Sequence, residues 1–319
     1  MKRIAVLTSG GDAPGMNAAI RAVVRAGLYS GLEVFGVSRG YYGLIYQDFL
    51  RMNSGSVADI IHRGGTILRT SRCDEFKEEA GRIRARESLR YFGINDLVAI
   101  GGNGTIQGGY KLAQLGVNVI AIPASIDNDI PGTDLAIGFD TAINTVSAAI
   151  NRIRDTATSH ERIFIIEVMG RRSGHIALAS GLAGGAESIL VPEVEFDLDK
   201  VVERLRQGLK RGKLHSIIVV AEGCCGAYAL SEKIHEMTGM ETKVTVLGHT
   251  QRGGTPTALD RMLASRMGKR AVDLILEGKK NRMVGFQGMK IVDVGLEKVV
   301  QGEKSIDLEI CEIARILSI

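Results

Sequence analysis

Two glycine-rich segments have the composition of loops that hold an anion. Residues 9–17 read SGGDAPGMN and residues 101–105 read GGNGT, and each segment follows a short apolar run typical of a β-strand. Glycine lets the backbone approach a ligand closely, and the N–H groups at a helix start favour negative charge. The first segment is not a P-loop, because Met16 and Asn17 stand where Lys and Ser or Thr would be. Both segments predict phosphate cradles, with ligand-free turns as the alternative.

Two carboxylates stand one residue apart in a third segment, PASIDND at residues 123–129. If this segment is extended, Asp127 and Asp129 point to the same side, together with Ser125. One carboxylate could then accept the proton of a substrate hydroxyl, and the other could hold Mg²⁺ directly or through water. The alternative is an Asp/Asn turn that caps a helix.

Arginine lies among glycines in two more segments, MGRRSGH at residues 169–175 and GHTQRGG at residues 248–254. The planar fork of Arg171 suits phosphate oxygens. A single exposed Arg is more often a solvated charge, and His249 alone would more often be a packed histidine than a catalyst. Together, the five segments contain no covalent-nucleophile arrangement. They indicate a phosphate-handling enzyme that works by positioning and charge neutralisation, as phosphoryl transfer requires.

The elements that would position these segments alternate along the chain. Apolar, β-branched runs predict strands at 4–7, 33–37, 96–100, 117–122, 163–168, 216–221 and 242–247. Helical spacing predicts helices at 18–30, 82–92, 141–156, 201–211 and 258–277, with Asp140 as the N-cap of the third. Such alternation predicts an α/β fold with mostly parallel sheets. The carboxyl ends of neighbouring strands would bring the polar segments together.

Composition narrows the class of protein. The chain has 319 residues, enough for about two domains, and its net charge of +4 gives no case for a nucleic-acid or membrane partner. Its 40 glycines are nearly twice the usual share of ~7%. Four cysteines without a CxxC spacing argue against zinc and for a reduced, cytoplasmic protein. We expect the N-terminal MKRIAVLTSGG to be a first strand, and no apolar run is long enough to span a membrane.

Six segments, taken in order, resemble the bacterial 6-phosphofructokinase family. They are TSGGDAPGMN (8–17), GGNGT (101–105), IDNDI (126–130), MGR (169–171), AEG (221–223) and LGHTQRGG (247–254). The resemblance runs over essentially the whole chain. It implies two Rossmann-like three-layer α/β/α domains with the active site in the cleft between them. The implied ATP-binding domain is 1–138 plus 252–304, and the fructose 6-phosphate-binding domain is 139–251 plus 305–319.

The resemblance also implies a reaction, in which the γ-phosphoryl group of ATP passes to the 1-hydroxyl of fructose 6-phosphate with Mg²⁺. Asp127 would be the general base, and Arg171 and Arg72, with Ser125, would complete the catalytic set. The ATP site would use Gly11, Arg72, Cys73, Gly102, Asn103, Gly104 and Thr105, and the metal would be held by Asn103 and Asp129. The sugar phosphate would contact Ser125, Ile126, Asp127, Met169, Gly170, Arg171, Glu222, His249, Thr250 and Arg252, with Arg162 and Lys243 supplied by a neighbouring subunit.

Regulation and assembly follow from the same resemblance. It implies a homotetramer with an effector pocket. ADP bound there activates the enzyme, and phosphoenolpyruvate bound there inhibits it. The matching positions are Arg21, Arg25, Asp59, Arg154, Gly185, Glu187, Arg211, Lys213 and His215.

Several residues depart from the family pattern. Asn103 stands where the ATP-using enzymes usually have Asp, so one negative charge is missing and weaker metal binding is expected. Lys243 replaces the usual Arg, and His175 replaces the usual Asp. Gly104 and the small Ala124 favour ATP over pyrophosphate as donor. Two alternatives stay open: a pyrophosphate-dependent enzyme, and a weakly active regulatory paralogue.

Overall fold

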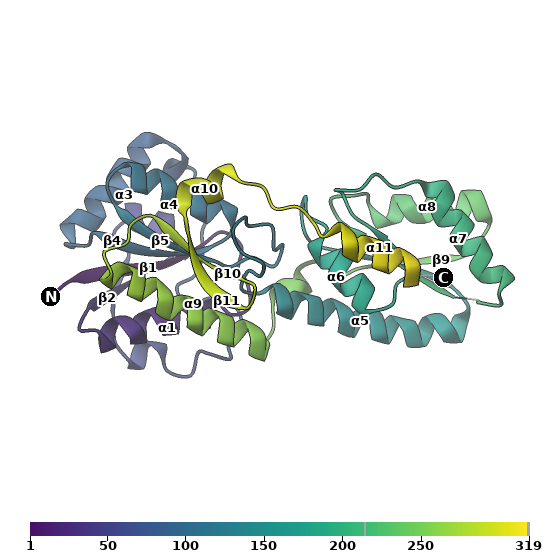
Figure 1. Ribbon diagram of the computed structural model, residues 1–319, viewed down its shortest axis with the longest axis horizontal. Coiled ribbons are helices and arrows are strands. Elements are labelled where there is room, and N and C mark those ends of the chain that lie inside the picture. Colours follow the sequence, from purple (N-terminus) through teal and green to yellow (C-terminus); the bar gives the residue numbers. More distant parts are fainter. Residues whose placement is uncertain (214, 318–319) are drawn as a thin grey trace. The chain divides into compact units, whose positions relative to one another are not determined.

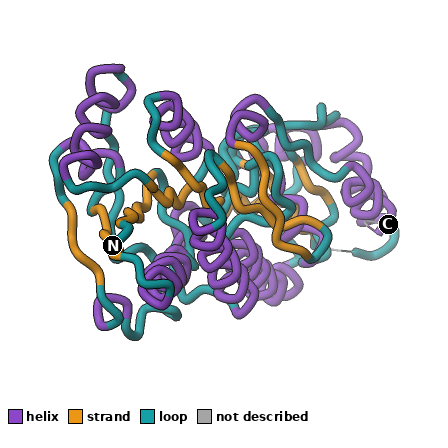
Figure 2. The backbone as a smooth tube through the Cα atoms, turned by 60° about the vertical axis from the view of Figure 1, so that its left-hand side comes forward, coloured by secondary structure: helices purple, strands orange, loops and turns teal. Residues whose placement is uncertain are grey.

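The computed structural model describes residues 1–213 and 215–317, which form two compact units. Unit 1 comprises Met1–Ser125, Ile130–Thr141 and Arg252–Lys304, and unit 2 comprises Ile126–Asp129, Ala142–Gln251 and the residues from Ser305 onward. Each unit is a sheet with helices packed against it, as Figures 1 and 2 show. None of the helices in these two ranges is long and apolar enough to cross a membrane.

Unit 1 is built on a seven-stranded sheet in the order β11-β10-β5-β4-β1-β2-β3. The edge strands β3 and β11 run antiparallel to their neighbours, and the other neighbouring strands are parallel. The strands are β1 (Arg3–Ser9), β2 (Glu33–Val37), β3 (Phe49–Met52), β4 (Asp96–Gly101), β5 (Asn118–Pro123), β10 (Arg282–Gln287) and β11 (Lys290–Gly295). The helices are α1 (Met16–Tyr29), α2 (Tyr41–Ile45), α3 (Glu79–Tyr91), α4 (Asn103–Gln114), α9 (Ala258–Leu276) and α10 (Leu296–Gln301).

The central strands are apolar at nearly every position because both faces of the sheet are covered. Ala5 and Leu7 of β1 belong to one core cluster with residues of α2, α3, α4 and α10. Ile4 faces the other way, toward Gly27 of α1. On that face α1 packs closely on α9, because a Cβ at Gly268 would come within 2.6 Å of Ala22. The result is a three-layer α/β/α unit.

Unit 2 has a four-stranded, all-parallel sheet in the order β7-β8-β6-β9. The strands are β6 (Ile163–Val168), β7 (Ser188–Leu190), β8 (Ser216–Ala221) and β9 (Thr242–Val246). The helices are α5 (Phe139–His160, which starts in unit 1), α6 (His175–Ala183), α7 (Leu198–Lys210), α8 (Ala227–Thr238) and α11 (Leu308–Leu317). One core cluster joins the sheet to α7 and α8. On the other face α6 packs against β7 and β8, and α11 packs on α6.

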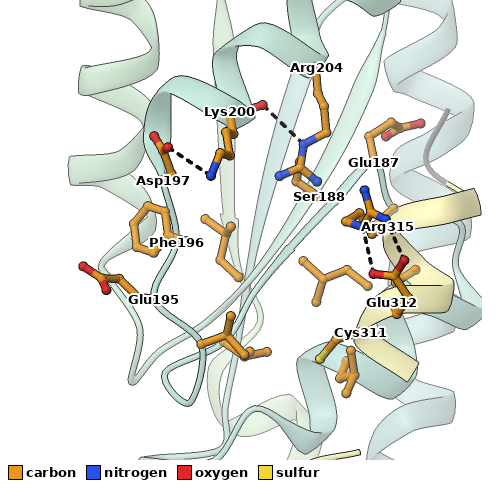
Figure 3. Close-up of a pocket in the computed structure, with 17 residues that line it drawn as sticks. Glu187, Ser188, Glu195, Phe196, Asp197, Lys200, Arg204, Cys311, Glu312 and Arg315 are labelled. Carbon is orange, nitrogen blue, oxygen red and sulfur yellow. Dashed lines mark hydrogen bonds and ion pairs between the residues drawn. The ribbon is translucent and has the colours of Figure 1, made fainter. Parts of the chain in front are cut away.

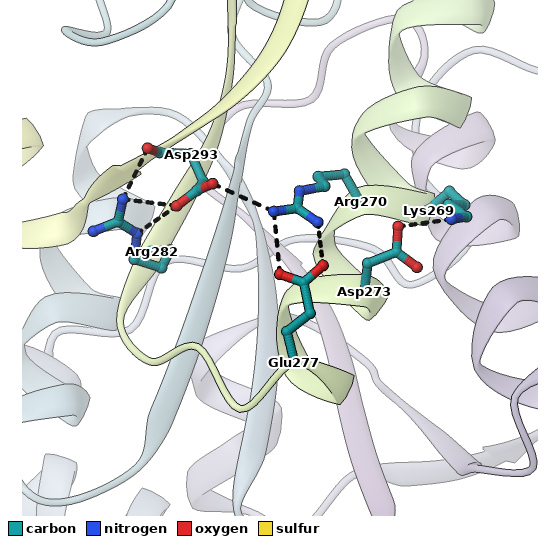
Figure 4. Close-up of polar contacts among 6 residues, drawn as sticks. All are labelled: Lys269, Arg270, Asp273, Glu277, Arg282 and Asp293. Carbon is teal, nitrogen blue, oxygen red and sulfur yellow. Dashed lines mark hydrogen bonds and ion pairs between the residues drawn. The ribbon is translucent and has the colours of Figure 1, made fainter.

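An ion-pair network holds the added β10–β11 hairpin to α9 (Figure 4). Arg282 of β10 bonds to Asp293 of β11, with 2.8 Å between Nε and Oδ2. Arg270 of α9 reaches Asp293 as well, with 3.4 Å between Nη2 and Oδ1, and also pairs with Glu277 at the end of its own helix. β10 has only two residues in register with β5, so these side chains add contacts where the backbone pairing is short.

The α/β prediction is confirmed, and the predicted strands and helices are present with shifted ends. Periodicity missed the short strands β3 and β7, the hairpin β10–β11, and helices α2, α4, α6, α8, α10 and α11. Several of these are small or glycine-rich and carry no clear period. One cap was predicted wrongly. α5 starts at Phe139, so Asp140 lies in its first turn, where its carboxylate accepts a hydrogen bond from Thr257 Oγ1.

The start of α5 is capped instead by Asp260 of α9. Its carboxylate accepts hydrogen bonds from the main-chain N–H groups of Gly138 (2.8 Å) and Thr141 (2.9 Å), and from the Thr141 hydroxyl. Burial raises the pKa of Asp260, although these three hydrogen bonds oppose the shift. A cap from a residue 120 positions away along the chain cannot be read from local sequence.

Candidate active site

Three polar loops meet at one edge of the sheet in unit 1. They follow β1, β4 and β5, which are parallel neighbours, with Ser9 in register with Gly101 and Gly101 in register with Pro123. The carboxyl ends of adjacent parallel strands form the usual ligand-binding edge of an open α/β sheet. The structure therefore brings together the first two glycine-rich segments and the start of the third, at Ser125.

The first loop has the left-handed backbone that its glycines permit. Gly10 has φ 82° and Gly15 has φ 104°, and α1 begins at the next residue without a side-chain cap. Gly11 lies directly under Arg252, because a Cβ at this position would come within 2.3 Å of the Arg252 Nη1 atom. Arg252 also donates a 3.2 Å hydrogen bond to the carbonyl oxygen of Asp12. A guanidinium group thus lies against the glycine loop.

The second loop is tighter than the sequence suggested. Gly101 ends β4, Gly102 precedes α4, and Asn103 and Gly104 already belong to the first turn of α4. The expected irregular nest is therefore the N-terminus of a helix, which has no side-chain cap and no acidic residue in its first turn. Asn103 and Gly104 are exposed, and a Cβ at Gly104 would meet no atom within 4 Å. This leaves open space at a positively polarised helix end.

The buried Thr105 holds the first two loops together through hydrogen bonds. It is 2% exposed, and its hydroxyl donates a 2.9 Å hydrogen bond to the carbonyl oxygen of Ser9. Its main-chain N–H bonds to the Gly102 carbonyl oxygen, and its own carbonyl oxygen accepts from the buried Tyr41 hydroxyl. Both hydrogen-bond donors of Thr105 are therefore committed to the protein. We expect Thr105 to position the loop rather than to donate to a ligand.

The third segment is not extended, which corrects the geometry expected for its carboxylates. Ile126 and Asp127 form a turn, and Asn128 has a left-handed backbone with φ 51°. The alternation that would place Asp127 and Asp129 on one side therefore does not apply. Ile126 is fully buried. Ser125 is half-buried and lies 3.7 Å from the position of a Cβ on Gly102.

Unit 2 has its own loop cluster at the carboxyl ends of β6, β8 and β9. Glu222, just after β8, accepts hydrogen bonds at Oε1 from the N–H groups of Gly170 (3.2 Å) and Arg171 (2.8 Å), just after β6. The buried Gln251, after β9, accepts from the N–H of Met169 at 3.2 Å. A Cβ at Gly223 would lie 1.9 Å from the Arg171 carbonyl oxygen, so glycine is required there. These contacts hold the 169–171 backbone rigidly.

Asp127 lies beside Arg171 in this cluster. Its side chain is 6% exposed, and the Arg171 Nε atom is 3.7 Å from Asp127 Oδ2. The Ser173 hydroxyl donates a 3.2 Å hydrogen bond to the Asp127 carbonyl oxygen, which ties the turn to the loop after β6. The Arg171 side chain is 68% exposed, and its backbone is left-handed with φ 54°. A buried carboxylate next to an available guanidinium can accept a proton while the cation meets developing negative charge.

Other predicted residues have no described contact to these clusters. His249 and Thr250 lie on the exposed 3₁₀ turn after β9, and the Thr250 hydroxyl bonds to the Leu247 carbonyl oxygen. In unit 1, Arg72 is exposed in the loop before α3, and Cys73 packs against the core.

Arg162 and Lys243 lie at the opposite end of the unit 2 sheet. Arg162 precedes β6, Lys243 is the second residue of β9, and both pair with Glu241, at 3.0 and 2.8 Å. The six residues of β6 separate this end from Met169, a distance of roughly 20 Å at ~3.3 Å per residue. Within one chain, these two cations therefore do not join the cluster of Asp127 and Arg171.

The effector-type residues fall into two groups. Arg21 and Arg25 lie one turn apart on α1, and Asp59 is exposed in the same unit with φ 51°. The members in unit 2 gather near the start of β7. There Arg154 donates to the carbonyl oxygens of Gly184 and Gly185, Lys213 pairs with Glu187, and the Glu187 side chain also accepts from Ile217 N–H. His215 lies 3.5 Å from the Thr158 hydroxyl, and Arg211 ends α7.

The described residues offer no cage for a metal ion. Residues 1–213 and 215–317 contain no cluster of three or more His, Cys, Asp or Glu side chains that could hold one. The four cysteines are free. A divalent ion bound mainly by phosphate oxygens and water needs only one or two protein oxygens. Asn103 of unit 1 is exposed, and Asp129 of unit 2 is half-buried.

Sequence reasoning missed Gln251, Ser173, Tyr41 and Asp260. Gln251 and Ser173 stand inside segments that had been singled out, so their polar side chains among glycines were a usable signal. Tyr41 and Asp260 act on loops that are distant in sequence, at positions 105 and 138. Nothing in their local sequence indicates those partners.

The comparisons with known proteins agree over the full chain. The sequence model of the family described as phosphofructokinase matches residues 3–275. The ATP-dependent 6-phosphofructokinases of Alkaliphilus metalliredigens and Natranaerobius thermophilus are 58% and 56% identical over 319 residues, covering 100% of both chains. The solved phosphofructokinase from Saccharomyces cerevisiae has a TM-score of 0.89 and 36% identity over 94% of this chain, which spans only 45% of the yeast chain. This chain belongs to the phosphofructokinase family.

Proposed function

We propose that this chain is an ATP-dependent 6-phosphofructokinase. It transfers the γ-phosphoryl group of ATP to the 1-hydroxyl of fructose 6-phosphate, and it releases ADP and fructose 1,6-bisphosphate. Full-length relatives with this name, 55–58% identical, support the assignment. The structural observation that carries it is the buried Asp127 carboxylate beside the exposed Arg171 guanidinium.

The chemistry assigned to Asp127 is proton acceptance. As the sugar 1-hydroxyl oxygen forms its bond to the γ-phosphorus, its proton passes to the Asp127 carboxylate, and the bond to the leaving ADP oxygen breaks. Arg171 and Arg72 stabilise the negative charge on the transferring phosphoryl group, and the Ser125 hydroxyl donates a hydrogen bond to this group. The hydrogen bonds from Gly170 and Arg171 to Glu222 support this role, because they hold the Arg171 backbone in place.

ATP is assigned to unit 1. The uncapped start of α4 and the open space at Gly104 suit nucleotide phosphates. Gly11, Arg72, Cys73 and Gly102 are assigned to the nucleotide site, and Thr105 positions its loop. Gly104 and the small Ala124 match the ATP-using pattern of the family, which favours ATP over pyrophosphate.

A divalent cation accompanies ATP in this family, and we assign it as Mg²⁺. Asn103 and Asp129 are the residues that would hold it. When bound, it supplies charge neutralisation and phosphate alignment. The protein contributes an amide oxygen and one carboxylate, which is a weaker donor set than two carboxylates.

The sugar phosphate is assigned to Arg252 and to the loop cluster of unit 2. The assigned contacts in that cluster are Ile126, Met169, Gly170, Glu222, His249 and Thr250. Arg162 and Lys243 lie too far along β6 to contribute within the same chain. They would complete the phosphate site of a neighbouring subunit in a homotetramer. Regulation by ADP and phosphoenolpyruvate at the effector-type residues, and a cytoplasmic location, belong to the same proposal.

The deciding experiment is a coupled assay of fructose 1,6-bisphosphate formation with Mg²⁺ and either ATP or pyrophosphate. We expect turnover with ATP at ordinary kinase rates, about 1–100 s⁻¹, and none with pyrophosphate. Turnover with pyrophosphate alone would reassign the donor. No turnover with either donor, in a protein that still binds fructose 6-phosphate by calorimetry, would contradict the catalytic assignment.

A further inference from the structure

Unit 2 contains a cavity of about 340 Å³ that is separate from the loops after β6, β8 and β9. Figure 3 shows it between the edge strand β7, the segment that leads into α7, and the C-terminal helix α11. Its size falls within the range of small-molecule sites. Among the residues given a role above, Glu187 of the effector-type group also lines this cavity.

Most of the cavity wall is apolar. The side chains that form it include Leu178, Leu190, Val191, Phe196 and Ala314. Leu190 and Val191 are buried, and Phe196 and Ala314 are half-buried, so the wall is preformed rather than a loose surface. Such a wall suits the apolar body of a ligand.

Arg204 of α7 brings a positive charge into the cavity. Its Nε donates a 3.3 Å hydrogen bond to the Lys200 carbonyl oxygen. Within residues 1–213 and 215–317, no carboxylate lies at ion-pair distance from Arg204. The other lining cations differ, because Lys200 pairs with Asp197 and Arg315 pairs with Glu312 (Figure 3). Burial, and then the like charge of Arg315, lower the pKa of Arg204.

A serine with a buried hydroxyl group is also among the lining residues. Ser188 of β7 is 3% exposed, and its Oγ has no hydrogen-bond partner in the part of the chain that the structure describes. Buried hydroxyl groups are normally hydrogen-bonded, so an unsatisfied one indicates a missing partner.

The lining carboxylates limit the negative charge that a ligand of this cavity can carry. Glu187, Glu195, Asp197 and Glu312 all contribute to the wall. A polyanion such as a nucleotide would be repelled by them, whereas a single negative charge can be placed at Arg204. The apolar wall excludes a small hydrated ion as the preferred occupant.

We propose that this cavity binds an amphipathic monocarboxylate, with the carboxylate on Arg204 and the apolar chain against Leu190, Val191 and Phe196. The assignment is independent of the phosphoryl-transfer reaction. It predicts one site per chain that accepts a medium-chain fatty acid and rejects inorganic phosphate.

Octanoate is the probe, titrated calorimetrically into the full-length protein. We expect one octanoate per chain in the wild type, and a Kd weakened about tenfold or more in Arg204→Gln, because a charge-assisted hydrogen bond is lost. Arg204→Lys should restore part of the affinity. Arg206→Gln is the matched control, because Arg206 is on the same helix but bonds to the Met237 carbonyl oxygen outside the cavity. The octanoate affinity of Arg206→Gln should equal that of the wild type.

A second measurement locates the ligand. In crystals soaked with 8-bromooctanoate, the anomalous bromine signal should lie among Leu190, Val191 and Phe196, and it should disappear in Ala314→Phe, which fills the cavity. The proposal is overturned if octanoate does not bind, if Arg204→Gln and Arg206→Gln bind it equally, or if the bromine lies elsewhere.

Discussion

The hydroxyl of Thr105 donates a 2.9 Å hydrogen bond to the main-chain carbonyl oxygen of Ser9. This bond joins the loop after β1 to the first turn of α4, across 96 residues of sequence. It also explains a glycine. A Cβ at Gly101 would lie 2.3 Å from Thr105 Oγ1 and 2.5 Å from the Ser9 carbonyl oxygen, so the two loops can meet only if residue 101 has no side chain.

Gly101→Ala should therefore destabilise the protein by about 1–3 kcal/mol, because backbone as well as side chain must move. Gly104→Ala is the matched substitution three residues later. A Cβ there meets nothing within 4 Å, and alanine is the better helix former by about 0.5–1 kcal/mol. In chemical denaturation, the free energy of unfolding of Gly101→Ala should be well below that of the wild type. That of Gly104→Ala should equal or exceed the wild-type value. Equal stabilities would contradict the close packing of the two loops.

Asp127→Ser should lower kcat by about 100- to 10,000-fold, which is the usual contribution of a general base. Fructose 6-phosphate binding, measured by calorimetry, should stay nearly unchanged. Asp155→Ser, an exposed substitution on α5, serves as the control and should keep normal turnover. Near-normal kcat in Asp127→Ser would remove the role assigned to this carboxylate.

Asn103→Asp should strengthen Mg²⁺ binding several-fold, because a carboxylate replaces an amide oxygen as the donor. The same change places a negative charge in the first turn of α4 and should raise stability by about 0.3–1 kcal/mol. Mg²⁺ titration in the presence of ATP measures the first effect, and denaturant unfolding without ligands measures the second. A stability gain with unchanged Mg²⁺ affinity would show that residue 103 does not contact the metal.

Arg25→Ala should abolish the responses to ADP and phosphoenolpyruvate and leave the basal kcat unchanged. Arg25 is exposed and one turn from Arg21 on α1, so its loss removes charge without disturbing the core. Arg90→Ala, on the exposed end of α3, is the matched control and should leave regulation intact. Initial-rate assays over a range of each effector provide the test. Persistence of both responses in Arg25→Ala would move the effector site elsewhere.

Asp293 predicts a pH dependence of stability. Burial acts to raise its pKa, but the hydrogen bonds and charges of Arg282 and Arg270 together hold that pKa below the ordinary value. The stabilisation by this carboxylate is therefore fully present above the unfolded-state pKa of about 3.9, and it is lost as pH falls through the folded-state pKa. Asp293→Asn should lower the free energy of unfolding by about 1 kcal/mol at pH 7. The difference in this free energy between the variant and the wild type should become smaller in acid.

The control for that substitution is Asp273→Asn, on the same helix as Arg270. Asp273 pairs with Lys269 one turn away, in a helical i,i+4 pair whose lysine is 68% exposed and which contributes about 0.3–0.5 kcal/mol. Unfolding curves from pH 7 to pH 3 should show a larger loss at neutral pH for Asp293→Asn than for Asp273→Asn. Equal losses would mean that the network in Figure 4 adds nothing beyond a surface ion pair.

Local sequence was sufficient for the elements with strong patterns. Strands β1, β4, β6 and β8 are apolar on both faces and were predicted as buried parallel strands, which the structure confirms. The glycine-rich and arginine-containing segments were predicted at strand ends, where they lie. Both successes rest on short-range physics, since burial on two faces requires continuous apolarity and a sharp turn requires glycine.

Tertiary structure decided the rest, because the partners are distant along the chain. Asp127 and Asp129 looked alike in sequence, but a left-handed Asn128 breaks their alternation and the contact with Arg171 singles out Asp127. The cap of α5 comes from Asp260 rather than from the adjacent Asp140, since capping depends on which side chain the fold brings to the helix end. The sequence by itself therefore determined which residue types stand at the ends of the strands. Only the folded chain determined which of them touch, because hydrogen bonds and ion pairs act over a few ångströms of space and not over positions in the sequence.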